Sequence, residues 1–130
     1  MKRLWHCAVA ILSLCNLSHC DVCKSLCSCS AHDVNCEGKG ITSRLLLNIS
    51  FPTSTTRLAL WDNAITQLPE RVFSGLTNLT YLDLDENKIE ELPHKIFHGL
   101  TALTTLYLQR NAITQLTGNV FSGLGNLRSL

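Results

Sequence analysis

The chain has 130 residues, 45% of them hydrophobic, which is enough to build one small domain with its own core. Beyond residue 20 it carries nine basic and ten acidic residues. Proteins that bind nucleic acids concentrate lysine and arginine on the contacting surface, so this balance argues against a nucleic acid as the main partner.

Residues 1–20 have the organisation of a secretory signal peptide. Lys2 and Arg3 precede a hydrophobic run from Cys7 to Cys15, and Ser18 and Cys20 place small residues three and one before a cleavage point. The run is shorter than the roughly 20 apolar residues that cross a bilayer. We therefore expect no membrane span in this chain and a secreted or cell-surface location.

Four of the seven cysteines remain after cleavage at residue 20: Cys23, Cys27, Cys29 and Cys36. An even, clustered set in an exported protein predicts disulfide bonds, and counting alone allows three pairings. Zinc is the alternative, but the spacing lacks two CxxC pairs and zinc suits a reducing compartment better. We expect disulfides and no metal in a cysteine-rich cap over residues 21–54.

Beyond the predicted signal peptide, which contains Asn16-Leu17-Ser18, two sequences have the form that accepts an N-linked glycan. Asn48 begins Asn-Ile-Ser and Asn78 begins Asn-Leu-Thr. Both are predicted glycosylation sites.

Residues 55–130 repeat with a period of 24. The units start at Leu58, Leu82 and Leu106, and a fourth unit stops at Leu130. Each contains LxLxxNxI followed by further leucines and a phenylalanine. A fixed period in this range is typical of a solenoid, because one unit cannot bury its apolar face without a neighbour.

Each unit divides into a predicted strand and a predicted outer turn. The LxL step alternates apolar with polar or aromatic residues, as a short strand with one buried face does. Proline at 69 and 93 and glycine at 75 and 99 predict a helical turn between them, whereas Thr117 and Gly118 replace the proline in the third unit. Because strands lie closer together than helical turns, the parallel sheet should line the concave side.

An asparagine recurs at an otherwise apolar, inward position as Asn63, Asn87 and Asn111. A buried amide is unfavourable unless its donors and acceptor are paired, so we expect bonds to the backbone of adjacent turns. A catalytic asparagine would not recur at one phase of every unit. The role of the three recurring asparagines is therefore predicted to be structural.

The outward strand positions vary between units while the skeleton does not, so they are free to carry specificity. The predicted ligand-binding positions are Arg57, Ala59, Trp61, Asp62, Tyr81, Asp83, Asp85, Glu86, Thr105, Tyr107, Gln109 and Arg110. Their three large aromatics are of a type enriched in interface hot spots, although each could merely shield the sheet. The acidic second unit is either a solvated face or a surface that steers a basic epitope. Twelve residues are fewer than the about 20–30 a side of a standard interface, which argues against strong binding by this segment alone.

The spacing Cys23-x3-Cys27-x-Cys29-x6-Cys36, followed by Phe51-Pro52 and the 24-residue units, resembles extracellular leucine-rich-repeat proteins with an N-terminal cysteine cap. It is most similar to the variable lymphocyte receptors of jawless vertebrates; Slit-like, Toll-like and Nogo-receptor-like ectodomains share the cap and period. The resemblance implies an α/β solenoid, a leucine-rich-repeat horseshoe with short parallel concave strands, helical turns or loops on the convex face, and an N-terminal disulfide cap. It also implies the pairs Cys23–Cys29 and Cys27–Cys36 and a concave ligand surface.

The chain departs from the receptor pattern in two respects. Glycine stands at 75, 99 and 123, where these receptors commonly carry other residues, and no C-terminal cysteine cap follows the repeats. The last leucines should be exposed, because a solenoid normally ends in a cap with a polar outer face. We therefore expect a fragment of a longer reading frame or an incomplete copy.

The sequence holds no convincing catalytic constellation. His94 and His98 are four residues apart and could share a metal, but no third ligand is well placed and the HExxH pattern is missing. We expect no enzyme and no cofactor. The prediction is an extracellular recognition module, an antigen or immune receptor, that binds a protein or carbohydrate ligand on its concave sheet. The alternative is a fragment of a matrix, adhesion, Slit-, Toll- or Nogo-receptor-like ectodomain.

Overall fold

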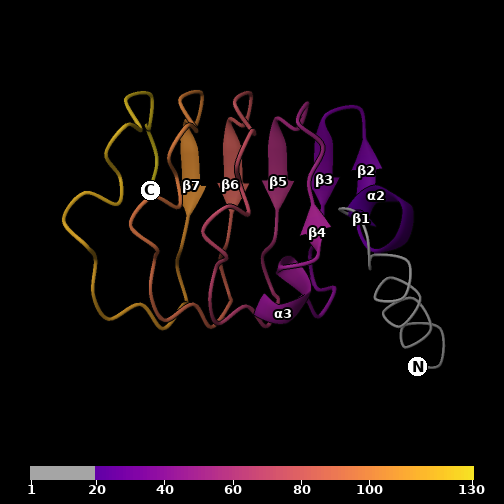
Figure 1. The fold of residues 1–130 in the computed structure, drawn as a ribbon, viewed down its shortest axis with the longest axis horizontal. Coiled ribbons are helices and arrows are strands. Elements are labelled where there is room, and N and C mark those ends of the chain that lie inside the picture. Colours follow the sequence, from indigo (N-terminus) through magenta and orange to yellow (C-terminus); the bar gives the residue numbers. More distant parts are fainter. Residues whose placement is uncertain (1–19) are drawn as a thin grey trace.

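The computed structural model describes residues 20–130, and a row of five strands runs along it (Figure 1). The strands are β2 (Ser28–Ser30), β3 (Asp33–Asn35), β5 (Arg57–Ala59), β6 (Tyr81–Asp83) and β7 (Thr105–Tyr107), side by side in that order. The first two pair antiparallel, and every later pair is parallel. The predicted solenoid with a parallel sheet is confirmed. The predicted signal peptide lies outside the described residues apart from Cys20.

The strands are in register at the 24-residue period. Val34 pairs with Leu58, Leu58 with Leu82, and Leu82 with Leu106. These four side chains point inward and are buried, while their strand neighbours point outward. The period therefore begins inside the cap, one unit earlier than the repeats recognised in the sequence.

The cap closes the N-terminal end of the stack. It contains β1 (Cys20–Asp21), α2 (Val22–Ser25), α3 (Ser43–Leu46) and β4 (Ile49–Ser50), and β1 and β4 form a separate two-stranded parallel sheet. Thr42 caps α3, because its hydroxyl oxygen accepts a hydrogen bond from the backbone N–H of Leu45. Among residues 20–130, no helix has the length and apolar character that crossing a membrane requires.

Two disulfide bonds hold the cap together. Cys23 is bonded to Cys29 and Cys27 to Cys36, the pairing that the family resemblance implies. The second bond is the more buried, with Cys27 8% exposed and Cys36 fully buried. It links the segment that follows α2 to the end of β3 and hence to the main sheet.

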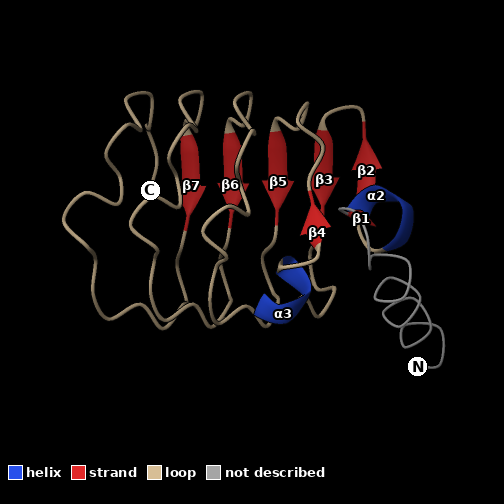
Figure 2. Cartoon of the chain, in the orientation of Figure 1, coloured by secondary structure: helices blue, strands red, loops and turns tan. Residues whose placement is uncertain are grey.

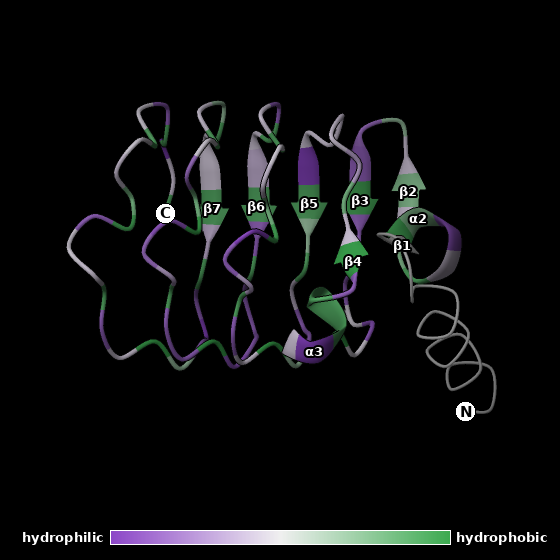
Figure 3. Ribbon diagram, in the orientation of Figure 1, coloured by the Kyte–Doolittle hydropathy of each residue, from purple (hydrophilic) through white to green (hydrophobic). Residues whose placement is uncertain are grey.

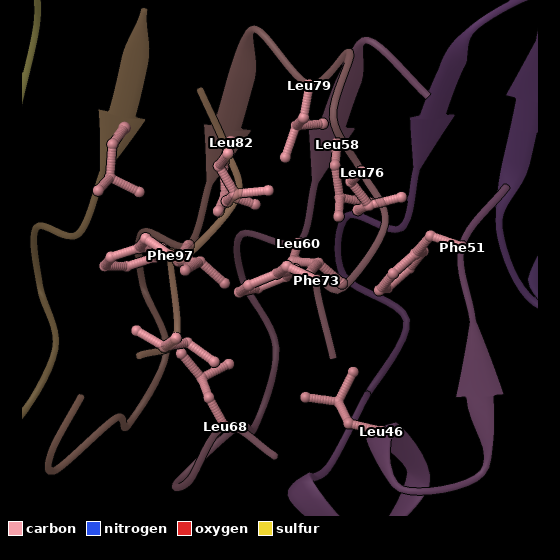
Figure 4. Packing of buried hydrophobic residues seen from close by; sticks show 14 of the residues in the cluster. Leu46, Phe51, Leu58, Leu60, Leu68, Phe73, Leu76, Leu79, Leu82 and Phe97 are labelled. Atoms are coloured by element: carbon pink, nitrogen blue, oxygen red, sulfur yellow. The ribbon is translucent and has the colours of Figure 1, made fainter. Parts of the chain in front are cut away.

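The interior is filled by hydrophobic residues that recur at the same position of each unit. Each repeat strand has a hydrophobic middle residue between more polar neighbours (Figure 3). Figure 4 shows Phe51, Phe73 and Phe97 in a row, with Leu58, Leu76, Leu79 and Leu82 on one side of it and Leu46 and Leu68 on the other. The rings of Phe73 and Phe97 stack with centroids 6.5 Å apart, and Phe97 stacks on Phe121 at 6.0 Å. Removal of these side chains from water is the main stabilising term of the stack.

The outer face of the repeats consists of turns rather than helices (Figure 2). In the first unit, the N–H of Val72 donates to the carbonyl oxygen of Pro69 at 3.0 Å. In the third, where threonine replaces the proline, Val120 donates to Thr117 at 3.1 Å, so the turn does not depend on the proline. Gly75 ends its turn at a φ of +82°, a left-handed conformation that glycine adopts without steric penalty.

The core opens beyond β7. Leu116 and Leu130 are 57% and 59% exposed, whereas Leu124 is 8% exposed and Leu127 is half-buried. The exposure predicted for the last leucines therefore holds for Leu130 and is wrong for Leu124. Leu116 and Leu130 border an open hollow of about 580 Å³ that is also lined by Leu108, Ile113 and Phe121.

Candidate ligand-binding face

The outward residues of β5, β6 and β7 form a regular grid. The other predicted positions were expected on the strands but lie just past the strand ends: Trp61, Asp62, Asp85, Glu86, Gln109 and Arg110. Both sets together are here called the concave face. Along the register, Arg57 faces Tyr81 and Tyr81 faces Thr105, whereas Ala59 faces Asp83 and Asp83 faces Tyr107. Backbone hydrogen bonds continue past the strands. The N–H of Leu60 donates to the carbonyl oxygen of Asp83 at 2.8 Å, and the N–H of Leu84 donates to that of Tyr107 at 2.9 Å. The backbone beneath the predicted positions is therefore fixed by hydrogen bonds.

The next positions along each unit mark the point where the chain leaves the sheet. Asp62, Glu86 and Arg110 have φ values of +55°, +51° and +54°, a left-handed turn that the sequence analysis missed. This turn sends the following asparagine inward. Arg110 forms a salt bridge with Glu86 on the exposed side of the turn.

The inward asparagines form the predicted ladder. The Nδ2 atom of Asn87 donates to the carbonyl oxygens of Leu60, Leu84 and Asp85 at 3.0–3.1 Å, and Oδ1 accepts from the N–H of Ile65 at 3.2 Å. Asn63 and Asn111 repeat this arrangement. The structural role predicted for these asparagines is confirmed. They hold the backbone of the face and do not belong to its surface.

Tyr81 lies at the centre of a side-chain cluster on the concave face. The guanidinium carbon of Arg57 lies 4.0 Å from the centre of the Tyr81 ring. Tyr107 meets Tyr81 edge to face, with centroids 5.7 Å apart and an interplanar angle of 80°. The Tyr81 hydroxyl donates to Oδ2 of Asp83 at 3.0 Å. Both tyrosines remain half-exposed, so they cover the sheet and still offer surface to a partner.

Trp61 lies apart from this tyrosine pair, just past the end of β5. It is half-buried, and its backbone carbonyl oxygen accepts hydrogen bonds from the N–H of Gly38 and the amide of Asn63. The three predicted aromatics thus form one contacting pair and one side chain on the neighbouring unit.

The two aspartates of the second unit are held by hydrogen bonds to neutral groups. Oδ1 of Asp83 accepts from the N–H of Asp85 at 3.0 Å, and Oδ1 of Asp85 accepts from the N–H of Gln109 at 2.7 Å. With its NH2 group turned toward Asp85, the Gln109 side chain donates to the same carboxylate. Burial raises the pKa of the Asp85 carboxyl, and the charge of Asp83 raises it further.

Burial, followed by the hydrogen bond to Asp83 and the charge of that carboxylate, raises the pKa of Tyr81 from 10.0 to about 12. In a Tyr107→Phe background, Tyr81 is the only tyrosine, so tyrosinate absorbance near 295 nm reports it directly. We expect Asp83→Asn to lower this pKa partway toward 10, because burial, the largest cause, remains. Stability should fall between pH 10 and 12, since the unfolded chain has already lost the proton there. Glu91→Gln is the matched control. A Tyr81 titration near 10 in the parent would contradict the geometry.

The cap supplies a further column of the concave face that the sequence analysis missed. Asp33 faces Arg57 and Asn35 faces Ala59 across the β3–β5 pair. Glu37 lies beside Trp61, because the backbone N–H groups on either side of it, those of Cys36 and Gly38, donate to the carbonyl oxygens of Ala59 and Trp61. All three cap side chains are exposed. The signal was present, since Val34 and Ile41 precede Leu58 and Ile65 by one period of 24.

The other candidate residues lie away from this face. Asn48 follows α3 and is exposed, with its amide donating to the carbonyl oxygen of Arg44 at 3.3 Å; Asn78 is exposed beside the buried Leu79. His94 and His98 border a small hollow on the outer turns. Within residues 20–130, no three His, Cys, Asp or Glu side chains gather as metal ligands.

A profile of the family described as Leucine rich repeat matches residues 53–111 and 77–130, together more than half of the chain. The chain belongs to the leucine-rich-repeat family. Among its relatives is the human SLIT and NTRK-like protein 6, which is 44% identical over 61 residues. That match covers 43% of this leucine-rich-repeat chain and 7% of the relative.

Solved structures share the fold, and two of them are compared with the chain. A chain of the Drosophila Toll–Spatzle complex superposes with a TM-score of 0.55 at 29% identity, covering 64% of this chain and 11% of that one. An internalin from Listeria monocytogenes superposes with a TM-score of 0.57 at 27% identity, covering 76% and 27%. This leucine-rich-repeat chain therefore spans only a small part of the proteins it matches.

These findings support a protein-interaction module. Leucine-rich-repeat proteins are generally non-enzymatic binding modules with protein ligands. The two disulfide bonds indicate an extracellular or cell-surface location, because such bonds persist in oxidising compartments.

Proposed function

We propose that this chain is an extracellular recognition module that binds its ligand through the concave face. The observation that carries the proposal is the grid of varying, part-exposed side chains on a backbone fixed by strand pairing and the asparagine ladder. A face of this kind can change its specificity without loss of the fold. The cap column extends it beyond the twelve predicted positions toward the size of a standard interface.

The cysteine spacing and the repeat pattern support an antigen or immune receptor of the variable-lymphocyte-receptor kind. The relative SLIT and NTRK-like protein 6 favours the second candidate, a matrix, adhesion, Slit-, Toll- or Nogo-receptor-like ectodomain fragment. Both candidates use the same face, for a protein or a carbohydrate. Glycan attachment at Asn48 and Asn78 and the domain boundary at residue 54 remain predictions.

The test is binding of the secreted, tetramerised chain to an array of purified extracellular proteins and glycans. We expect Trp61→Ala combined with Tyr107→Ala to weaken any hit by about 30-fold or more, because half-buried aromatics are typical binding hot spots. Thermal unfolding should stay cooperative, since neither side chain belongs to the buried core.

The control is His94→Ala combined with His98→Ala, which removes two side chains from the opposite, outer side. This variant should bind as the parent does. Equal binding by parent and aromatic variant would place the site elsewhere.

A further inference from the structure

The charges of the described residues are divided unevenly between the concave face and the rest of the surface. The face and its cap column carry two arginines, Arg57 and Arg110, and six carboxylates: Asp33, Glu37, Asp62, Asp83, Asp85 and Glu86. Two minus six gives −4. The rest of residues 22–130 carries seven lysines and arginines and three glutamates, which gives +4. The concave face is therefore negative, whereas the rest of residues 22–130 is positive.

Both arginines of the face are already engaged. Arg57 lies over the ring of Tyr81, and Arg110 is paired with Glu86. Within residues 22–130, neither Asp83 nor Asp85 forms a salt bridge; they accept hydrogen bonds from a tyrosine hydroxyl and from backbone N–H groups. These two carboxylates therefore have no salt-bridge partner among residues 22–130.

The neighbourhood of these carboxylates suits a cationic side chain. Asp83 lies directly opposite Tyr107 in the strand register, so a negative group and an aromatic ring adjoin each other. Arg57 on Tyr81 shows that a guanidinium group fits over a tyrosine of this face. The carboxylates are spread along the sheet and, within residues 20–130, do not converge as metal ligands. The surface therefore fits a series of organic cations along a chain better than a single ion.

We propose that the concave face selects a protein partner whose contacting segment carries arginine or lysine side chains, which are received between the carboxylates of Asp83 and Asp85 and the ring of Tyr107. This inference rests on the proposed function, because it specifies the partner of the same face. Opposite charges on the two proteins speed their association. The aromatic ring beside the carboxylate favours a guanidinium group over an inorganic cation.

The test is selection of disulfide-closed, random twelve-residue peptides on phage against the secreted chain, in 50 mM NaCl. Selected peptides should be enriched in arginine and lysine over the starting library. Their Kd should rise about tenfold or more on Asp83→Asn with Asp85→Asn, and should rise as NaCl is increased to 300 mM. The control, Glu90→Gln with Glu91→Gln, removes the same charge from exposed residues of the same unit and should leave the Kd unchanged.

The substitutions to asparagine conserve shape and keep an acceptor oxygen, and circular dichroism and melting verify the fold. Non-basic peptides that lose binding on Trp61→Ala with Tyr107→Ala would overturn the charge selection and leave the proposed function standing. If both pairs of charge substitutions weakened the binding of basic peptides equally, the charge selection would also be overturned. The binding would then depend only on the overall charge of the protein. Peptides that tolerate every concave substitution, or no binders at all, would contradict the proposed function itself.

Discussion

Replacing Asn87 with leucine should lower the free energy of unfolding by about 3 kcal/mol, although leucine is the more hydrophobic residue. The amide is 6% exposed and lies between two turns of the coil. Its loss removes one hydrogen-bond acceptor and two donors from a site that water does not reach easily. Urea unfolding followed by circular dichroism, with the disulfides intact, measures the change.

The buried N–H of Ile65 accounts for most of this expected loss. Within residues 20–130, its acceptor is Oδ1 of Asn87. The three carbonyl oxygens that Asn87 contacts are less affected, because each keeps a second donor: the Asn63 amide for Leu60, the Asn111 amide for Leu84 and the backbone N–H of Asp62 for Asp85. A buried, unpaired N–H group costs about 1–3 kcal/mol, and the remaining loss comes from the three weakened carbonyl contacts.

Two further variants separate the ladder from general effects of the substitution. Asn119→Leu makes the same change on an exposed outer turn and should alter stability by less than about 0.5 kcal/mol. Asn87→Asp keeps the acceptor for Ile65 but turns an oxygen toward three carbonyl oxygens, so it should also destabilise. If the urea midpoint of Asn87→Leu matched that of the parent, the ladder would not contribute to stability.

The repeat part of the fold was predictable because one physical requirement recurs three times. Leu58, Leu82 and Leu106 can be buried together only if successive turns stack in register, so the period alone implies parallel strands. The asparagine ladder followed from the unfavourable burial of an amide. The outer turns were less predictable: a proline and a glycine are compatible with either a helix or a turn, and the structure has turns.

The cap was harder to predict, because its strand repeats the unit with little sequence identity. Asp33–Asn35 keeps the inward Val34 but not the leucine and asparagine pattern, and β2 joins it antiparallel, which no period indicates. The outward direction of residues such as Arg57 and Ala59 follows from the strand alternation, yet the contacts between these side chains were not foreseen. That Arg57 and Tyr107 meet on Tyr81 depends on side-chain conformations across three strands, which alternation in the sequence does not specify.

Removing the second cap disulfide with Cys27→Ala and Cys36→Ala should reduce the free energy of unfolding by about 2–4 kcal/mol. The bond closes a loop with a sequence separation of 9, and both half-cystines are buried, so alanine also leaves a cavity. Chemical unfolding of the secreted double variant gives the value, and changing both cysteines avoids a free thiol.

The first disulfide offers the matched comparison, because Cys23 and Cys29 close a loop of similar length, with a sequence separation of 6. Chain entropy alone would make the two losses nearly equal. We expect the smaller loss for Cys23→Ala with Cys29→Ala, since Cys29 is exposed whereas Cys36 directly follows β3 and its N–H donates to the carbonyl oxygen of Ala59. The Cys27–Cys36 bond thereby holds the cap column of the concave face against β5. Loss of this bond should therefore lower both the stability and the affinity for the ligands that the parent binds. Equal losses would mean that both bonds act only on the unfolded chain and that the sheet keeps its first column without them.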